Sequence, residues 1–245
     1  MDRLCGGNRY REIVFEKEKT SWSGETLTMS VENGSARLST VFIVDDDPAV
    51  CKSLRWLIES VGLPVETFDS ARDFLNRKDP ARPGCLVLDV RMPGMSGLEL
   101  QEALVEEGCT WPVIIMSAHG DVPMAVRAMK SGAVYFFEKP VAEQMLLDHI
   151  QHALDFDREQ RQKMATQQET LDRYISLTPR EAEVLDLVAE GLSSKQIGQK
   201  LNVSFKTVEA HRAKITKKMQ AGGVPDLVKQ YLAVKPILSQ SLKHS

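Results

Sequence analysis

Side chains suited to handling a phosphoryl group or a metal cation stand directly after four apolar runs of this chain. Asp45 and Asp46 follow the first run, and Asp89, Ser117 and Lys139 end or follow later ones. Neighbouring carboxylates repel one another unless a cation joins them, and oxygen-only ligands select a hard cation such as Mg²⁺. The three aspartates would carry −3, which Mg²⁺ and the lysine balance with +3. Such a neutral pocket can accept an incoming phosphoryl group.

Asp89 is the expected phospho-acceptor. A carboxylate can act as a nucleophile and form an acyl phosphate, and Asp89 ends the run that should form the central strand. Ser117 would offer its hydroxyl to a phosphate oxygen, and Lys139 its ammonium group. Each residue alone has a commoner explanation, because such an aspartate usually lies in a turn or caps a helix, and such a serine does the same. Their joint occurrence at four strand ends favours the functional interpretation.

The elements that must position these residues are short β-rich runs alternating with amphipathic stretches. Several runs are apolar throughout, as strands buried on both faces are. Five strand–helix repeats predict an α/β doubly wound five-stranded parallel sheet, in which the carboxyl ends of the strands share one edge and ligands bind there. The expected strands are Thr40–Val44, Val65–Phe68, Cys85–Asp89, Val113–Ser117 and Val134–Glu138, and the expected helices are Ala49–Val61, Ser70–Leu75, Gly97–Glu107, Val122–Lys130 and Val141–Phe156.

Charge divides the 245 residues into two parts. Residues 40–155 hold 10 Lys/Arg and 18 Asp/Glu, a net charge of −8, whereas residues 175–245 hold 11 and 6, a net charge of +5. An acidic part followed by a basic one predicts two domains, with nucleic acid as a candidate partner of the second. The four cysteines show neither C-x-x-C spacing nor a nearby histidine cluster, which excludes a recognisable zinc or disulfide framework. Without an apolar span or signal peptide, we expect a cytoplasmic protein that does not contact a membrane.

The flanking segments are polar. Residues 1–39 show no sustained periodicity and are expected to be a disordered extension. Met29 is a candidate for the true start of the protein, a hypothesis that N-terminal sequencing would test. Residues 155–174 are rich in Gln and hold no Gly or Pro, so they are expected to continue the preceding helix as a helical linker.

The acidic part resembles two-component receiver domains over residues 40–154. The resemblance rests on Val44–Asp47, Leu88–Gly94 and Glu138–Pro140, and the segment His119–Val126 narrows it to response regulators of the FixJ type. It implies a flavodoxin-like receiver fold with Mg²⁺ as the cofactor.

The resemblance also implies a set of metal ligands. Asp45 and Asp46 would form the acidic pocket, with Asp46 and Asp89 as direct Mg²⁺ ligands. The backbone carbonyl of Arg91 would supply a third protein ligand. Asp47 is expected to be a loop or capping residue rather than a ligand.

Two further residues match the switch pair of receiver domains. The Ser117 hydroxyl would move towards the phosphoryl group, and the aromatic ring of Phe136 would follow inward. Ser117 stands where threonine is common, which keeps the hydroxyl. His119 lies outside the matching motif positions, so we interpret it as structural rather than as a phosphotransfer residue.

The basic part is expected to be all helical. Thr178–Glu181 is a capping box that opens the first helix, and the helix–turn–helix pattern that follows spans about residues 194–213. The third helix, Phe205–Met219, holds five Lys/Arg against one Glu, which suits entry into the major groove. A short fourth helix is expected at Val224–Val234. The expected DNA contacts are Lys206, Thr207, Glu209, His211, Arg212 and Lys214.

Four segments of this part resemble the LuxR-type DNA-binding domain, which we expect at residues 175–238. They are Leu177–Glu181, Gly191–Ser193, Lys195–Ile197 and Thr207–His211. The resemblance implies that the third helix reads double-stranded DNA and that the fourth takes part in dimer contacts.

The leading hypothesis is a response regulator of transcription that is not itself an enzyme. A sensor histidine kinase would phosphorylate Asp89, the receiver would form a homodimer through the face around Val122–Glu138, and the dimer would bind DNA, with RNA polymerase as a further partner. One alternative is a small Mg²⁺-dependent phosphatase, which usually carries a second aspartate where this chain has Arg91. The other is a regulator that works without phosphorylation, which the complete set of pocket residues disfavours.

Overall fold

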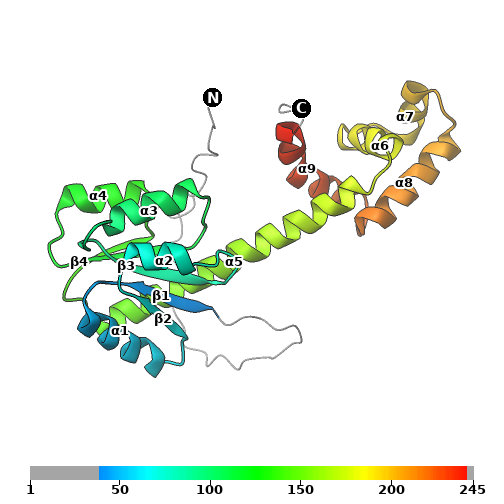
Figure 1. Cartoon of the computed structure of the whole chain (residues 1–245). Helices are drawn as coiled ribbons and strands as arrows, with labels where there is room; N and C mark the ends of the chain where they lie inside the picture. Colours follow the sequence, from blue (N-terminus) through cyan, green and yellow to red (C-terminus); the bar gives the residue numbers. More distant parts are fainter. Residues whose placement is uncertain (1–38, 242–245) are drawn as a thin grey trace. The chain divides into compact units, whose positions relative to one another are not determined.

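The computed structural model describes residues 39–241, and the chain forms two compact units that divide after Glu159. The extension expected at residues 1–39, including Met29, lies outside the described residues except for its last position. Figure 1 shows the elements of each unit, which are described separately below.

The first unit is a five-stranded parallel sheet in the order β2-β1-β3-β4-β5, which confirms the predicted doubly wound fold. The central strands are buried along their whole length, as their apolar runs predicted. Its elements are β1 (Thr40–Val44), α1 (Pro48–Ser60), β2 (Val65–Phe68), α2 (Ala71–Arg77), β3 (Gly84–Asp89), α3 (Gly97–Glu106), β4 (Val113–Ser117), α4 (Val122–Lys130), β5 (Tyr135–Glu138) and α5 (Glu143–Ile175).

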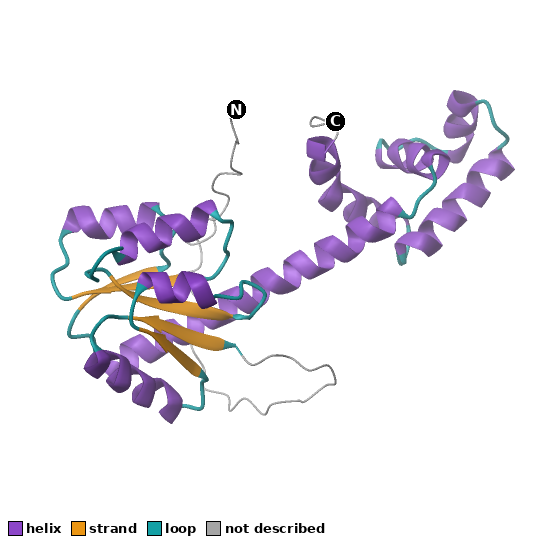
Figure 2. Cartoon of the chain, viewed as in Figure 1, coloured by secondary structure: helices purple, strands orange, loops and turns teal. Residues whose placement is uncertain are grey.

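Helices cover both faces of the sheet, with α1 and α5 on one side and α2, α3 and α4 on the other (Figure 2). Neighbouring residues of β1 enter different cores because side chains alternate along a strand. Ile43 packs with Ile58 of α1 and Ile150 of α5, whereas Phe42 packs with Phe74 of α2 and Leu100 of α3. The two cores together fix the register of the sheet, because a slip of one residue would exchange the faces.

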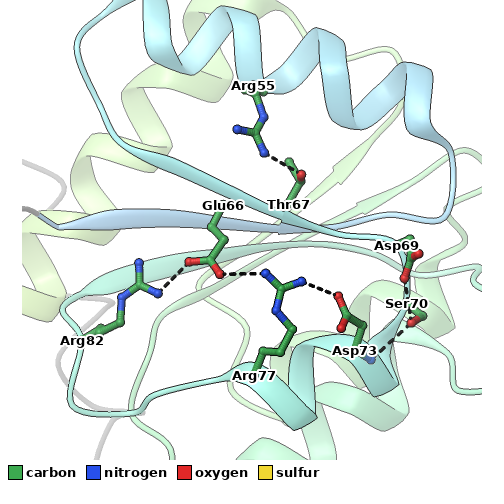
Figure 3. Close-up of polar contacts among 8 residues, drawn as sticks. All are labelled: Arg55, Glu66, Thr67, Asp69, Ser70, Asp73, Arg77 and Arg82. Atoms are coloured by element: carbon green, nitrogen blue, oxygen red, sulfur yellow. Dashed lines mark hydrogen bonds and ion pairs between the residues drawn. The ribbon is translucent and has the colours of Figure 1, made fainter.

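The edge strand β2 carries polar contacts on both faces, shown in Figure 3. Arg82 Nη1 and Arg77 Nη2 lie 2.6 and 3.4 Å from the two carboxylate oxygens of Glu66. On the other face, Arg55 Nη2 donates to the Thr67 hydroxyl at 2.7 Å. Charged side chains on an edge strand hinder pairing with a foreign strand, so this network suits the exposed side of the sheet.

The second unit is helical. It contains the end of α5, then α6 (Pro179–Ala189), α7 (Ser194–Leu201), α8 (Phe205–Met219) and α9 (Val224–Ser241). The expected capping box opens α6: the Thr178 hydroxyl accepts from the Glu181 backbone N–H, and the Glu181 carboxylate accepts from the Thr178 N–H. The core of the unit is formed by α6 to α9, and its fully buried apolar residues include Val184, Leu185, Ile197, Val208, Ile215 and Met219.

One long helix runs on as expected, and a second helix is longer than expected. The segment expected as a receiver helix and a linker is one continuous helix, α5, of 33 residues. Beyond residue 154 it is still attached to the sheet, because the buried Asp157 carboxylate accepts a hydrogen bond from the Gly84 backbone N–H at 2.9 Å. The expected end of the last helix at Val234 was wrong: α9 continues through Pro236 to Ser241, although proline disfavours a helical conformation at the residue before it. Among the described residues, no helix is both long and apolar enough to cross a membrane.

Candidate functional site

The polar residues predicted at the strand ends converge at one edge of the sheet. Asp45 and Asp89 are both buried, with 4 % and 8 % of their surface exposed. The Lys139 ammonium donates to Asp45 Oδ2 at 2.7 Å and to Asp89 Oδ1 at 2.6 Å. Lys139 is positioned by its backbone N–H, which donates to the Ser117 carbonyl at 2.8 Å. The parallel register thus brings the ends of four strands to one edge, where Lys139 contacts residues of the other three.

Burial and charge act against each other in this pocket. Burial raises the pKa of Asp45 above its ordinary value, and the hydrogen bond from Lys139 opposes that rise only in part. Burial alone would lower the pKa of Lys139, but its hydrogen bonds to Asp45 and Asp89 outweigh this effect and raise the pKa. Lys139 is therefore a permanent cation at neutral pH, and it lies between two buried carboxylates.

The loop after β3 is folded tightly around Asp89. The Arg91 backbone N–H donates to Asp89 Oδ2 at 2.6 Å, so both carboxylate oxygens already have a donor. At Gly97, the first residue of α3, an added Cβ would lie 2.0 Å from the carbonyl oxygen of Asp89. Only glycine permits this approach. Gly97 was not predicted as a site residue. The only indication in the sequence was its position shortly after the segment that holds Asp89.

The loop after β1 gives its three aspartates different positions. Asp45 Oδ1 accepts from the Asp47 backbone N–H at 2.9 Å. Asp47 caps α1 by accepting from the Ala49 N–H at 2.8 Å, which agrees with its predicted role as a capping residue. Asp46 is exposed beside the pocket.

The oxygen atoms at this edge suit a hard cation that takes only a few of its ligands from the protein. Across residues 39–241 no group of three or more His, Cys, Asp or Glu side chains is gathered as a metal site. Two carboxylates already converge on Lys139, however, and Mg²⁺ commonly takes one or two carboxylates and keeps several waters. The set implied by the resemblance, Asp46, Asp89 and the Arg91 carbonyl, would offer oxygen atoms only, which suits this ion better than Zn²⁺, because Zn²⁺ prefers nitrogen and sulfur ligands.

The expected switch residues lie on neighbouring strands, where Ser117 of β4 pairs with Glu138 of β5 and Phe136 pairs with Ile115. Ser117 is fully buried at the end of β4, and its hydroxyl oxygen accepts from the His119 backbone N–H at 3.3 Å. Phe136 of β5 is half-buried and packs against the core under α3 and α4. An added Cβ at Gly120 would lie 2.9 Å from the Phe136 ring, so the loop after β4 rests directly on this side chain. The His119 side chain is exposed.

In the second unit, α7, a short turn and α8 form the predicted helix–turn–helix. Asn202 ends α7 in the left-handed conformation, and the Ser204 hydroxyl caps α8 by accepting from the Thr207 N–H at 3.1 Å. Val208, Ile215 and Met219 are buried on the inner side of α8, as their spacing predicted. The opposite side of α8 carries exposed basic residues, among them Lys206 and Lys214.

The predicted DNA contacts differ in their surroundings. Lys206, Thr207 and Lys214 are exposed, whereas His211 is half-buried. Arg212 and Glu209 are bound to the neighbouring helix: Arg212 Nη1 donates to the Ser194 hydroxyl oxygen at 2.7 Å, and that hydroxyl donates to Glu209.

This network between α7 and α8 was not expected from the sequence. Ser194 starts α7 and is almost fully buried, and its hydroxyl links the two helices of the motif. DNA contact by these side chains stays a prediction.

Comparisons with known proteins identify both units. Residues 41–151 match the family model of the response regulator receiver domain, and residues 175–230 match that of bacterial regulatory proteins of the luxR family. The transcriptional regulatory protein TdiR of Thauera aromatica is 47% identical over 190 residues, covering 78% of this chain and 84% of that protein. The transcriptional regulatory protein FixJ of Azorhizobium caulinodans is 43% identical over 192 residues, covering 78% and 91%.

A solved structure is similar over both units. The response regulator StyR superimposes with a TM-score of 0.73 at 47% identity, covering 79% of this chain and 98% of that one. The chain therefore belongs to the two-component response regulators that join a receiver domain to a LuxR-type DNA-binding domain. Its domains are those of phosphorylation-dependent transcription regulation, and the FixJ-type resemblance is confirmed.

Proposed function

We propose that Asp89 accepts the phosphoryl group from a sensor histidine kinase. The observation that carries this assignment is the pair of buried carboxylates, Asp45 and Asp89, that share the Lys139 ammonium. An Asp89 carboxylate oxygen would attack the phosphorus of a phosphohistidine, forming an acyl phosphate as the P–N bond breaks. The electron pair of that bond returns to the histidine nitrogen. Lys139 would then pair with a phosphoryl oxygen as charge moves onto Asp89.

Mg²⁺ is proposed as the cofactor of this step, held by Asp46, Asp89 and the Arg91 carbonyl, with Asp45 completing the acidic pocket. When bound, it would neutralise charge on the transferring phosphoryl oxygens. The geometry supports this, because the two buried carboxylates of Asp45 and Asp89 share the single ammonium of Lys139.

Phosphorylation is proposed to favour a dimer formed through α4 and β5, in the region Val122–Glu138. The outer side of α4 supports this assignment, because Val122, Val126 and Met129 are 76 %, 45 % and 44 % exposed. Apolar side chains grouped on one helix are typical of a contact surface. The Ser117 hydroxyl and the Phe136 ring would link the phosphoryl group to this surface, and a symmetric dimer would present two α8 helices to a two-fold symmetric DNA site.

The acceptor assignment is tested by Asp89→Asn with acetyl phosphate as the donor, because the amide cannot form the acyl phosphate. Intact mass should show one added phosphoryl group on the wild type and on the control Asp47→Asn, and none on Asp89→Asn. Equal incorporation by Asp89→Asn would refute the assignment. Omitting Mg²⁺ should abolish labelling of the wild type, and light scattering with DNA-binding assays should show a phosphorylation-dependent dimer that binds DNA more tightly.

A further inference from the structure

A large apolar side chain is exposed at the start of the predicted recognition helix. Phe205 is the first residue of α8 and has 56 % of its surface exposed. It directly follows the capping residue Ser204 and precedes Lys206 and Thr207, which are also exposed. The first residues of a recognition helix are those that reach base edges in the major groove. Phe205 therefore stands where sequence is read.

The surroundings of the ring suit a nucleic acid. Phe205 forms one wall of a hollow of about 530 Å³ between α7 and the start of α8. No lining residue is acidic, and Lys195 of α7 is among the residues that line it. A positive side chain beside the N-terminus of a helix attracts phosphate. The hollow can therefore lie against the DNA backbone while the ring meets the edges of the bases.

Two of the polar side chains that could read bases on α8 are already hydrogen-bonded within the helix–turn–helix. Glu209 and Arg212 both bond to the Ser194 hydroxyl, so contacting bases would break that network. The Phe205 ring is not held by such contacts, because more than half of its surface is exposed to solvent.

We infer that Phe205 contacts the 5-methyl group of a thymine and thereby contributes to sequence specificity. Among the four bases, only thymine presents an apolar group in the major groove, and phenylalanine is one of the side chains that contact it. This inference rests on the proposed DNA-binding function and adds to it a residue and the chemical group that it reads.

The test compares thymine with deoxyuridine, which lacks the methyl group and keeps the same hydrogen-bonding groups. The phosphorylated full-length protein is first used to select duplexes from a random pool. Each thymine of a selected duplex is then replaced singly by deoxyuridine, and Kd is measured by fluorescence anisotropy at constant salt. Loss of one buried methyl should weaken wild-type binding by about fourfold at the position that Phe205 contacts.

Three variants distinguish this contact from general effects. Phe205→Ala should bind the thymine and deoxyuridine duplexes equally, and Phe205→Leu should keep part of the difference. Lys206→Ala should weaken all duplexes alike and reduce the salt dependence by about one phosphate contact, while keeping the wild-type difference. Helical circular dichroism of each variant checks that α8 is intact.

The outcomes separate the inference from the proposed function. If no duplex is enriched by any form of the protein, DNA binding itself fails. If duplexes are enriched but deoxyuridine has no effect at any position, or has the same effect on Phe205→Ala as on the wild type, the contact with thymine is refuted.

Discussion

Replacing Gly97 with alanine should impair both the stability of the receiver unit and its phosphorylation. The new Cβ would lie 2.0 Å from the Asp89 carbonyl oxygen, whereas real Cβ atoms essentially never approach closer than 3.0 Å. The gap between the start of α3 and the end of β3 must therefore open by about 1 Å. Because the contacted atom belongs to the acceptor's own backbone, the displacement reaches Asp89 directly.

The size of the effect follows from two opposing contributions. Overpacking a rigid site commonly costs about 1–3 kcal/mol, and here the contacted group is a backbone carbonyl, which cannot rotate away as a side chain can. Alanine is otherwise the better helix former, by up to about 1 kcal/mol, so the sign of the change reveals which effect dominates. We expect a net loss of about 2 kcal/mol. A nucleophile misplaced by about 1 Å can lose about 100-fold in rate.

Urea unfolding followed by tryptophan fluorescence measures the stability, because Trp56 and Trp111 both lie in the first unit. The rate of labelling by acetyl phosphate measures the second effect. The control for the exchange of glycine for alanine is Gly222→Ala, whose Cβ would meet nothing nearer than 3.8 Å. Because Gly222 lies in the second unit, its unfolding is followed by circular dichroism. If Gly97→Ala were as stable as the wild type and were phosphorylated at the same rate, the steric argument would be wrong.

Three further changes test other parts of the molecule. Lys139→Met leaves two buried carboxylates without their shared cation and should cost about 2–3 kcal/mol in urea unfolding, part of which millimolar Mg²⁺ restores; equal stability with and without Mg²⁺ would contradict this. The pKa of Glu181 lies below its ordinary value of 4.5, first because of the hydrogen bond that it accepts from Lys218. The contribution of Glu181 to the free energy of unfolding is therefore complete above that value and is lost as pH falls through the folded pKa. Glu181→Gln should therefore destabilise the C-terminal unit by about 1–2 kcal/mol at pH 7, as measured by circular dichroism during unfolding. If the difference in stability between variant and wild type did not shrink below pH 4.5, the link between this pKa and stability would be refuted. Trp111→Phe removes the indole hydrogen bond to the Arg82 carbonyl at 2.8 Å and should lower stability by about 1–3 kcal/mol, whereas an unchanged urea midpoint would show that the bond contributes nothing.

The central features of the fold could be predicted because they depend on local patterns. Apolar runs such as Val113–Ser117 indicate strands buried on both faces, and a parallel sheet brings their ends to one edge. The placement of Asp45, Asp89, Ser117 and Lys139 together followed from that rule without any knowledge of distances. The helix–turn–helix was predictable for a similar reason, since its caps and its buried residues have a fixed spacing.

Features that depend on contacts between distant segments could not be predicted. The buried Asp157 looked like part of a polar linker, but its partner is the backbone of Gly84 at the start of β3. Ser194 looked like an ordinary helix start, yet it bonds to Glu209 and Arg212 on the next helix. Sequence spacing gives no distance between elements, so a side chain that serves a neighbouring helix resembles one that faces solvent.

The contacts of the unmodified pocket bear on how the proposed phosphorylation would change it. Lys139 now divides its hydrogen bonds between Asp45 and Asp89. An acyl phosphate on Asp89 would carry about −1.5 to −2 of charge in place of the single charge of the carboxylate, and it would draw the ammonium towards itself. Asp45 is buried, and loss of this partner would cost free energy unless another cation took its place. A divalent ion beside Asp45 and Asp46 would fill that role, so the same ion that assists the transfer would stabilise the product. Without it, the repulsion among the carboxylates and the phosphoryl group would oppose the active state.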